Sequence, residues 1–156
     1  AGVTQAEVLV CCGGGGLTSG IALALEAHAP RMRVRPVEPE GFDDVARSLA
    51  AGDIVSNAAP SGSVCDAILT PSPGEITFPL LSRLCGPGLA VSDEEAMRAM
   101  ALAFSRLKIV LEPGGAVALA AALFHPDQIE GETVIAVATG GNVDAALFQE
   151  ALAHYA

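Results

Sequence analysis

Four consecutive glycines, Gly13–Gly16, separate an apolar segment, Glu7–Cys11, from an apolar stretch, Leu17–Ala29, that is typical of a helix. Glycines expose backbone N–H groups with no side chain in the way, and they accept positive φ angles where a turn needs them. A helix that begins directly after them directs the positive end of its dipole to the same point. This combination predicts an anion site, and phosphate is its usual ligand. A tight strand-to-helix turn without a ligand is the alternative.

The residues after the glycines exclude one common phosphate-binding loop and disfavour another. A Walker loop continues with Lys-Ser or Lys-Thr, whereas this chain continues with Leu17 and Thr18, which argues against a nucleoside triphosphate. A dinucleotide loop needs its last glycine five positions after its first, where this chain has Thr18 or Ser19. A dinucleotide-binding half-domain, with Glu38 contacting a ribose, is therefore a weaker alternative.

Length and composition narrow the class of protein. The 156 residues fit one domain, and 51% hydrophobic residues are enough for a large core. The net charge of −10 argues against nucleic acid or an acidic membrane surface as a partner. The four cysteines lack metal-ligand spacing, and neither a signal peptide nor a membrane-spanning run is recognisable. We therefore expect free thiols and a cytoplasmic location.

Strand and helix patterns alternate along the chain, which predicts an α/β fold with a mostly parallel sheet and helices on both faces. In such sheets ligands bind at the carboxyl ends of the strands, where residues 13–16, 38–44 and 139–142 are expected. Pro36 predicts an edge or irregular position for its strand. Beyond the first strand and helix, the expected strands are 33–38, 65–69, 88–91, 108–111 and 133–138, and the expected helices are 42–51, 76–85, 113–124 and 144–155, together with one that starts after Ser92.

The helix after Ser92 has the clearest start signal in the chain. Ser92 and Glu95 have the spacing of a capping box, in which each side chain bonds the backbone N–H of the other residue. Apolar residues then recur at steps of three and four, which is the spacing of one helix face. The residues expected to be buried on this face are Met97, Met100, Ala101, Phe104 and Leu107.

Several motifs in one order together resemble the threonine dehydratase and serine racemase family of fold-type II pyridoxal-phosphate enzymes. The resemblance covers nearly the whole chain, and no single glycine motif carries it. The matching stretches are Gly13–Leu17, Glu38–Asp44, Thr70–Glu75, Glu112–Ala116 and Thr139–Asp144.

The resemblance implies a lyase of amino-acid metabolism, of the threonine or serine dehydratase type. Such an enzyme uses pyridoxal 5'-phosphate to convert a β-hydroxy amino acid to a 2-oxo acid and ammonia. Serine racemisation and 3-hydroxyaspartate dehydration are alternatives within the family. A non-catalytic module is an alternative of another class. We expect a homo-oligomer.

The resemblance also implies that part of the enzyme lies outside this chain. In the family the Schiff-base lysine lies far upstream of the glycines, but none of the twelve residues before Gly13 is a lysine. Residues 1–156 would then be the C-terminal part of the cofactor-binding large domain, without the N-terminal segments and the small domain, and inactive alone. Lys108 is the only lysine, and we expect it at the amino end of a strand, away from the ligand.

The family pattern assigns cofactor-binding roles to individual residues. Gly13, Gly14, Gly15, Gly16 and the Leu17 amide would hold the phosphate. The Thr139 hydroxyl would contact the pyridine nitrogen, which leaves that nitrogen largely unprotonated and favours β-elimination; alternatively, Thr139 only caps the last helix. Glu112 would lie near the cofactor ring or, alternatively, cap the helix that begins at Pro113.

The resemblance further implies a divalent-cation site. Its ligands would be the Glu38 and Asp44 carboxylates and the Phe42 carbonyl, which are hard oxygen ligands suited to Mg²⁺ or Ca²⁺. The alternative is that these acids are solvated at a helix start, where the helix dipole favours negative charge.

Overall fold

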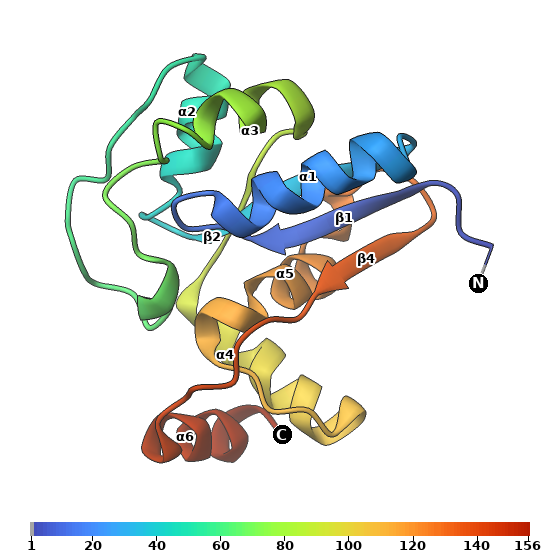
Figure 1. Ribbon diagram of the computed structural model, residues 1–156. Coiled ribbons are helices and arrows are strands. Elements are labelled where there is room, and N and C mark those ends of the chain that lie inside the picture. The colour runs from blue at the N-terminus through green and yellow to red at the C-terminus, as the bar shows by residue number, and fades with distance from the viewer. Residues whose placement is uncertain (1) are drawn as a thin grey trace.

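A four-stranded parallel sheet with strand order β3-β2-β1-β4 forms the centre of the molecule (Figure 1). The computed structural model describes residues 2–156. Strand β1 (Ala6–Cys11) lies between β2 (Met32–Pro39) and β4 (Val134–Val137), and β2 also pairs with β3 (Leu89–Val91). All three pairings are parallel. The predicted α/β fold with a parallel sheet is confirmed.

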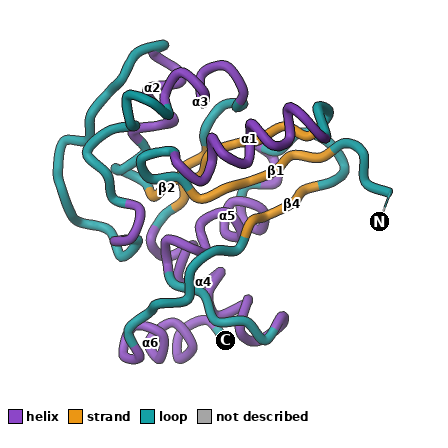
Figure 2. The backbone as a smooth tube through the Cα atoms, viewed as in Figure 1, coloured by secondary structure: helices purple, strands orange, loops and turns teal. Residues whose placement is uncertain are grey.

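Helices cover both faces of this sheet, as predicted. Figure 2 shows α1, α2 and α3 on one side of the strands and α4, α5 and α6 on the other. Helix α5 contacts the sheet, and α4 packs between α5 and α6. No helix within residues 2–156 has the length and apolar character needed to cross a membrane. The helices are α1 (Gly16–His28), α2 (Asp44–Ala51), α3 (Phe78–Leu84), α4 (Asp93–Leu102), α5 (Pro113–Phe124) and α6 (Ala145–Tyr155).

The side chains of β1 alternate between two separate hydrophobic cores. Val8 and Val10 pack with Ala22 of α1 on one face of the sheet. Leu9 and Cys11 belong to the larger core, which α4 and α5 dominate. Because successive side chains of a strand point to opposite faces, a strand covered on both faces is apolar at nearly every position.

The start of α4 confirms the predicted capping box, but the end of this helix differs from the prediction. Ser92 Oγ accepts a hydrogen bond from the Glu95 amide at 3.2 Å, and the Ser92 amide donates to the Glu95 carboxylate at 2.8 Å. Met97, Met100 and Ala101 are buried as expected. Phe104 and Leu107 are instead 38% and 59% exposed. Both lie in a π-helical turn, 103–107, whose wider winding rotates them off the buried face.

Two predicted strands are absent from the described residues. Segment 65–69 contains a short 3₁₀ helix, Asp66–Ile68, and segment 108–111 has no partner strand. Lys108 has a φ of 62°, which is not a strand conformation, so its predicted place at the amino end of a strand is wrong. Apolar β-branched residues favour a strand only where another strand can pair with them. A second short 3₁₀ helix spans Pro126–Gln128.

Pro36 predicted either an edge or an irregular position for its strand, and because β2 is internal, the edge alternative is wrong. Proline lacks the N–H group that a sheet ladder uses. Strand β3 pairs with β2 only from Val37 onward, so Pro36 precedes that ladder. The carbonyl of Pro87, just before β3, accepts instead from Arg35 Nε at 2.8 Å. A side-chain donor thus replaces a missing backbone donor beside the proline.

Replacing Ser92 with alanine should lower the free energy of unfolding by about 1 kcal/mol, because the cap bond to the Glu95 amide is lost. Urea unfolding of the complete protein measures this change. Ser92→Thr keeps a hydroxyl acceptor and should stay within about 0.5 kcal/mol of the wild type. Equal losses for both variants would contradict the capping role.

Candidate functional site

The carboxyl ends of three strands bring the predicted site residues to one edge of the sheet. Cys11 at the end of β1 is in register with Val37 of β2, and Val10 is in register with Val137 of β4. The glycines follow β1, and Thr139 follows β4. Cys11 Sγ lies 2.9 Å from Thr139 Oγ1. Residues 128 positions apart are therefore in direct contact at this edge.

The glycine loop leads directly into the amino terminus of α1. Helix α1 begins at Gly16, and its N-cap residue, Gly15, has a φ of 89°. The first hydrogen bond of the helix runs from the Ser19 amide to the carbonyl of the N-cap residue, Gly15, at 2.9 Å. The preceding amides of the first turn therefore have no acceptor within the helix. These amides and the helix dipole are the groups that would bind an anion at the site the sequence predicts.

A second segment holds the glycine loop in place. The Gly14 carbonyl accepts a hydrogen bond from the Gly74 amide at 3.1 Å, and the Thr77 hydroxyl also donates to it. A Cβ atom added to Gly15 would lie 2.7 Å from Leu81 Cδ1 and 2.9 Å from Thr77 Oγ1. Only glycine fits this position, since it lacks a Cβ and tolerates the positive φ. Residues 70–75 were among the stretches that resemble the family, but the sequence did not predict that this segment would hydrogen-bond the glycine loop.

A cavity of about 220 Å³ lies against the glycine loop. Within residues 2–156 no lysine or arginine lines it, so these residues would hold an anion there through backbone amides and the helix dipole rather than through a basic side chain. Lys108 lies elsewhere, exposed, with its Nζ donating to the Ser105 carbonyl at 2.8 Å. The lining residues are Cys11, Gly13, Gly14, Gly15, Gly16, Leu17, Thr18, Ala67, Ile68 and Thr70.

Thr139 lies at this edge and does not cap the last helix. The N-cap of α6 is Asp144, so the capping alternative for Thr139 is wrong. The Thr139 amide donates a hydrogen bond to the Gly115 carbonyl at 3.3 Å. A Cβ atom added to Gly115 would overlap the Thr139 carbonyl oxygen. Thr139 is thus held between β1 and the first turn of α5. Sequence reasoning identified Thr139 but missed Cys11, whose only signal is that it ends the strand before the glycines.

Glu112 connects the start of α5 to the turn after β4. The strand predicted at 108–111, directly before Glu112, is absent, and as the N-cap residue of α5 Glu112 makes no side-chain cap bond. Its carboxylate instead accepts from the Asn142 amide at 3.0 Å, and its own amide donates to the Gly140 carbonyl at 3.1 Å. Glu112 therefore lies close to Thr139, as an arrangement around one ligand would require.

Glu38 is fully buried at the end of β2, which rules out the alternative of a solvated acid. Its two carboxylate oxygens accept from the amides of Val45 and Ala46, at 2.9 and 2.8 Å, in the first turn of α2. Burial raises the pKa of Glu38 to about 8, although these two hydrogen bonds oppose the rise.

Asp44 is also fully buried, at the first position of α2. Its Oδ1 accepts from Asn57 Nδ2 at 2.6 Å, and its Oδ2 has no hydrogen-bond partner within residues 2–156. Burial raises the pKa of Asp44, and the Asn57 bond opposes this. The described residues contain no group of three or more His, Cys, Asp or Glu side chains that could hold a metal ion.

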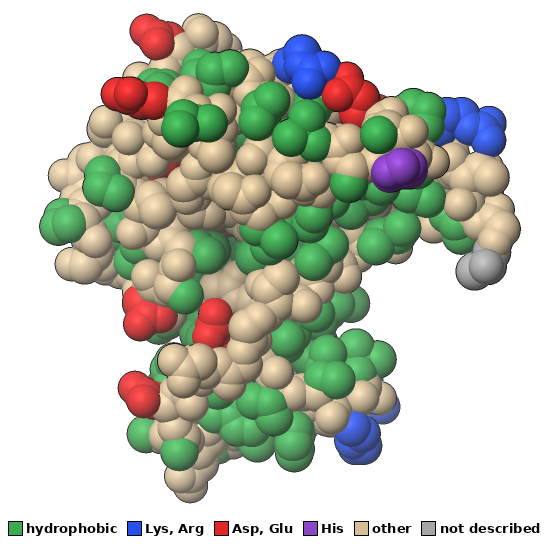
Figure 3. Space-filling model, in the orientation of Figure 1, with side chains coloured by type: hydrophobic (Ala, Val, Ile, Leu, Met, Phe, Trp, Pro, Cys, Tyr) green, Lys and Arg blue, Asp and Glu red, His purple; other side chains and the backbone are tan. Residues whose placement is uncertain are grey.

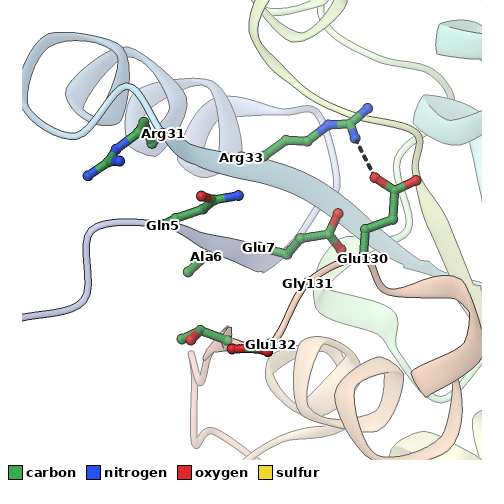
Figure 4. A pocket seen from close by; sticks show the side chains of 9 residues that line it. Gln5, Ala6, Glu7, Arg31, Arg33, Glu130, Gly131 and Glu132 are labelled. Carbon is green, nitrogen blue, oxygen red and sulfur yellow. Dashed lines mark hydrogen bonds and ion pairs between the residues drawn. The ribbon is translucent and has the colours of Figure 1, made fainter.

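A second and larger cavity, about 560 Å³, lies at the opposite end of the strands (Figure 4). It is lined by residues at the amino ends of β1, β2 and β4, among them Arg31, Arg33 and Glu130. Arg33 and Glu130 form an exposed ion pair at 3.5 Å across it. None of the predicted site residues lies there, and ligands of parallel sheets bind at the carboxyl edge. We therefore place the functional site at the smaller cavity.

Comparisons with known proteins identify the family of this chain. The sequence pattern of the family described as "Pyridoxal-phosphate dependent enzyme" matches residues 3–140. The beta-hydroxyaspartate dehydratase of Paracoccus denitrificans is 40% identical over 137 residues, which cover 88% of this chain and 43% of that protein. A serine racemase of Oryza sativa is 37% identical over 150 residues, or 93% of this chain and 44% of the relative.

The fold is also similar to that of a solved enzyme. The crystal structure of the T.th. threonine deaminase superposes with a TM-score of 0.86 and 43% identity, over 92% of this chain and 52% of that one. The fold is that of an α/β domain with a mostly parallel sheet. The chain belongs to the pyridoxal-phosphate dependent enzyme family. It spans about half the length of the relatives it matches.

Proposed function

We propose that residues 1–156 are the C-terminal part of the cofactor-binding domain of a pyridoxal-phosphate-dependent ammonia-lyase. The enzyme would convert a β-hydroxy amino acid to a 2-oxo acid and ammonia. The observation that carries this proposal is the glycine-lined cavity at the amino terminus of α1, with Thr139 beside it, just after the neighbouring strand β4. Relatives named as a hydroxyaspartate dehydratase and a threonine deaminase support the reaction class.

The residues around the cavity fit this cofactor. Gly13–Gly16 and the Leu17 amide would hold its phosphate without any cationic side chain. Thr139 would contact the ring nitrogen through a neutral hydroxyl, and Glu112 would lie beside the ring. Pyridoxal phosphate supplies an electron sink when it is bound. A neutral hydroxyl at the nitrogen keeps that sink weak, which suits loss of a β-hydroxyl group.

We also propose that a polypeptide segment outside residues 1–156 completes the domain and supplies the reactive lysine. Among the described strands, β4 pairs only with β1, so its other edge is open. Val134 and Ile135 on this strand are each 37% exposed. Figure 3 shows hydrophobic side chains at the surface on this face of the molecule. An open apolar edge suits a covering segment of the same protein, and the relatives are about twice as long.

The complete protein provides the test of this function. It should bind pyridoxal phosphate with an absorbance band near the visible–ultraviolet boundary, and borohydride should attach the cofactor to a lysine outside residues 1–156. Peptide mass spectrometry identifies that lysine. Absence of the band would contradict the proposal. A rise in melting temperature with a nicotinamide cofactor, together with no response to pyridoxal phosphate, would favour the dinucleotide alternative.

Racemisation of serine is the second candidate, because the rice relative is named a serine racemase. Incubation with L-threonine, L-serine and 3-hydroxyaspartate separates the possibilities. A dehydratase should release ammonia and a 2-oxo acid, whereas a racemase should form D-serine. Size-exclusion chromatography and cell fractionation address the expected homo-oligomer and cytoplasmic location.

We further propose a divalent cation at Glu38, Asp44 and the Phe42 carbonyl. The buried Asp44 Oδ2 without a partner supports this, since an unsatisfied carboxylate oxygen is costly and hard cations bind such oxygens. With Mg²⁺ at a hundredfold excess over its dissociation constant, the free energy of unfolding of the wild type should rise by about 2.7 kcal/mol. Asp44→Asn should lose this response.

Asp43→Asn is the matched control for the metal. Asp43 precedes Asp44 and forms an ion pair with Arg47 at 3.2 Å, but it belongs to no predicted ligand set. This variant should keep the Mg²⁺ response. A response of equal size in Asp44→Asn and the wild type would remove the metal assignment.

A further inference from the structure

Within residues 2–156, Cys11 is the one side chain that touches the Thr139 hydroxyl through a polar atom. It ends β1, it is 6% exposed, and its Sγ lies 2.9 Å from Thr139 Oγ1. It also lines the cavity that the glycine loop borders. Cys11 therefore contacts both the cavity and the residue expected at the cofactor's ring nitrogen.

The direction of this hydrogen bond decides what Thr139 can offer to a ligand. Either atom can be the donor in the contact between Cys11 and Thr139. A threonine hydroxyl has one proton, so a bond from Thr139 to the sulfur would leave no proton for another acceptor. An unprotonated ring nitrogen is an acceptor only. Thr139 can donate to such a nitrogen only when the Cys11 thiol is the donor to Thr139.

The surroundings of Cys11 favour the thiol form that this arrangement needs. Burial raises the pKa of the Cys11 thiol, the bond with Thr139 opposes that rise, and the nearby charge of Glu112 adds to it. A neutral thiol keeps its proton and can donate. A thiolate would instead take the Thr139 proton as an acceptor.

We infer that Cys11 is a positioning residue: its S–H donates to Thr139 Oγ1 and thereby directs the Thr139 proton at the ring nitrogen of pyridoxal phosphate. This inference rests on the proposed function, because it requires the cofactor in the glycine-lined cavity. Cys11 itself does not touch the reacting atoms. Its role is to set the donor direction of its neighbour.

The other cysteines provide a control for this role. Cys12 points to the other face of the sheet, where it packs with Val45 and Leu81. Cys85 is the C-cap residue of α3, is half-buried, and is not among the residues that line the cavity. Cys85→Ala therefore removes a thiol without touching Thr139 or the cavity.

The test uses the complete protein with two probes: pyridoxal phosphate and its 1-deaza analogue, in which C–H replaces the ring nitrogen. Cys11→Ala should bind pyridoxal phosphate about fivefold more weakly than the wild type, the loss expected for one hydrogen bond. The absorbance maximum of the bound cofactor should also shift. Cys11→Ser keeps a donor and should restore both properties. Cys85→Ala should match the wild type.

The analogue separates a polar role from simple packing. The 1-deaza analogue should bind Cys11→Ala and the wild type equally, because it has no nitrogen to accept the Thr139 proton. An equal loss for both probes, or unchanged affinity and absorbance for pyridoxal phosphate in Cys11→Ala, would overturn the inference. If Cys11→Ala does not fold, the wild type alone provides the test. Binding of the 1-deaza analogue as tightly as pyridoxal phosphate would then overturn the inference. Failure of the wild type to bind pyridoxal phosphate would overturn the proposed function itself.

Discussion

Replacing Gly15 with alanine should reduce the affinity for pyridoxal phosphate at least about 100-fold, or roughly 2.7 kcal/mol. An alanine Cβ would meet Leu81 Cδ1 at 2.7 Å and Thr77 Oγ1 at 2.9 Å, and the backbone holds a φ of 89° that alanine adopts only with strain. Both effects push the loop away from the amide arrangement that would hold the phosphate. Titration of the complete protein, followed by absorbance, measures the loss. The free energy of unfolding should also fall, by about 2 to 4 kcal/mol.

Gly20→Ala is the matched control for this variant. Gly20 lies within α1, the helix that Gly15 precedes, and an added Cβ there meets no atom within 4 Å. Alanine in a helix interior is more favourable than glycine by about 0.5 to 1 kcal/mol, so this variant should be slightly more stable and should bind the cofactor normally. Normal cofactor binding by Gly15→Ala would contradict the loop as the phosphate site.

Replacing Gly115 with alanine should cause the second large effect. Its Cβ would overlap the Thr139 carbonyl oxygen, so either α5 or the turn after β4 must move. We expect the free energy of unfolding to fall by about 3 kcal/mol, the upper range for an overpacked site. Thr139 would also leave its contact with Cys11, which should weaken cofactor binding and shift its absorbance. Urea unfolding and cofactor titration measure the two effects.

Gly114→Ala, at the neighbouring position of α5, is the control for Gly115. A Cβ there would lie 3.3 Å from Ile68 Cγ1, a side-chain carbon that can adjust. The loss of stability should therefore stay below about 1 kcal/mol. If both variants lose the same amount of stability, the close approach of Thr139 is not the reason for glycine at position 115.

Features set by neighbouring residues could be predicted from the sequence. The capping box joins Ser92 to Glu95, three positions apart, and both of its bonds are present. Helix α5 begins at Pro113, where proline's missing N–H is not needed. The glycine loop lies between β1 and α1, since the glycines separate the apolar strand segment from the apolar helix segment. In each case the interactions span a few residues, so the pattern contains the cause.

Features that depend on a distant partner could not be predicted in the same way. Segment 108–111 is apolar enough for a strand but has no strand beside it within the described residues. Phe104 follows the helical spacing, yet the π-helical turn exposes it. Glu112 bonds the Asn142 amide 30 positions away rather than capping its own helix. A single sequence does not show which backbone N–H or carbonyl groups, far away along the chain, will be available as hydrogen-bond partners.

The residues alone determined the α/β class, the glycine loop before α1, and the meeting of the glycines with Thr139 at the carboxyl edge of a parallel sheet. These follow from local backbone preference and from the rule that parallel strands end together. Only the tertiary structure decided that Glu38 and Asp44 are buried, that Gly115 packs on Thr139, and that the Cys11 thiol contacts the Thr139 hydroxyl. Burial and side-chain hydrogen bonds arise from segments far apart in the chain, and they exist only once those segments pack together.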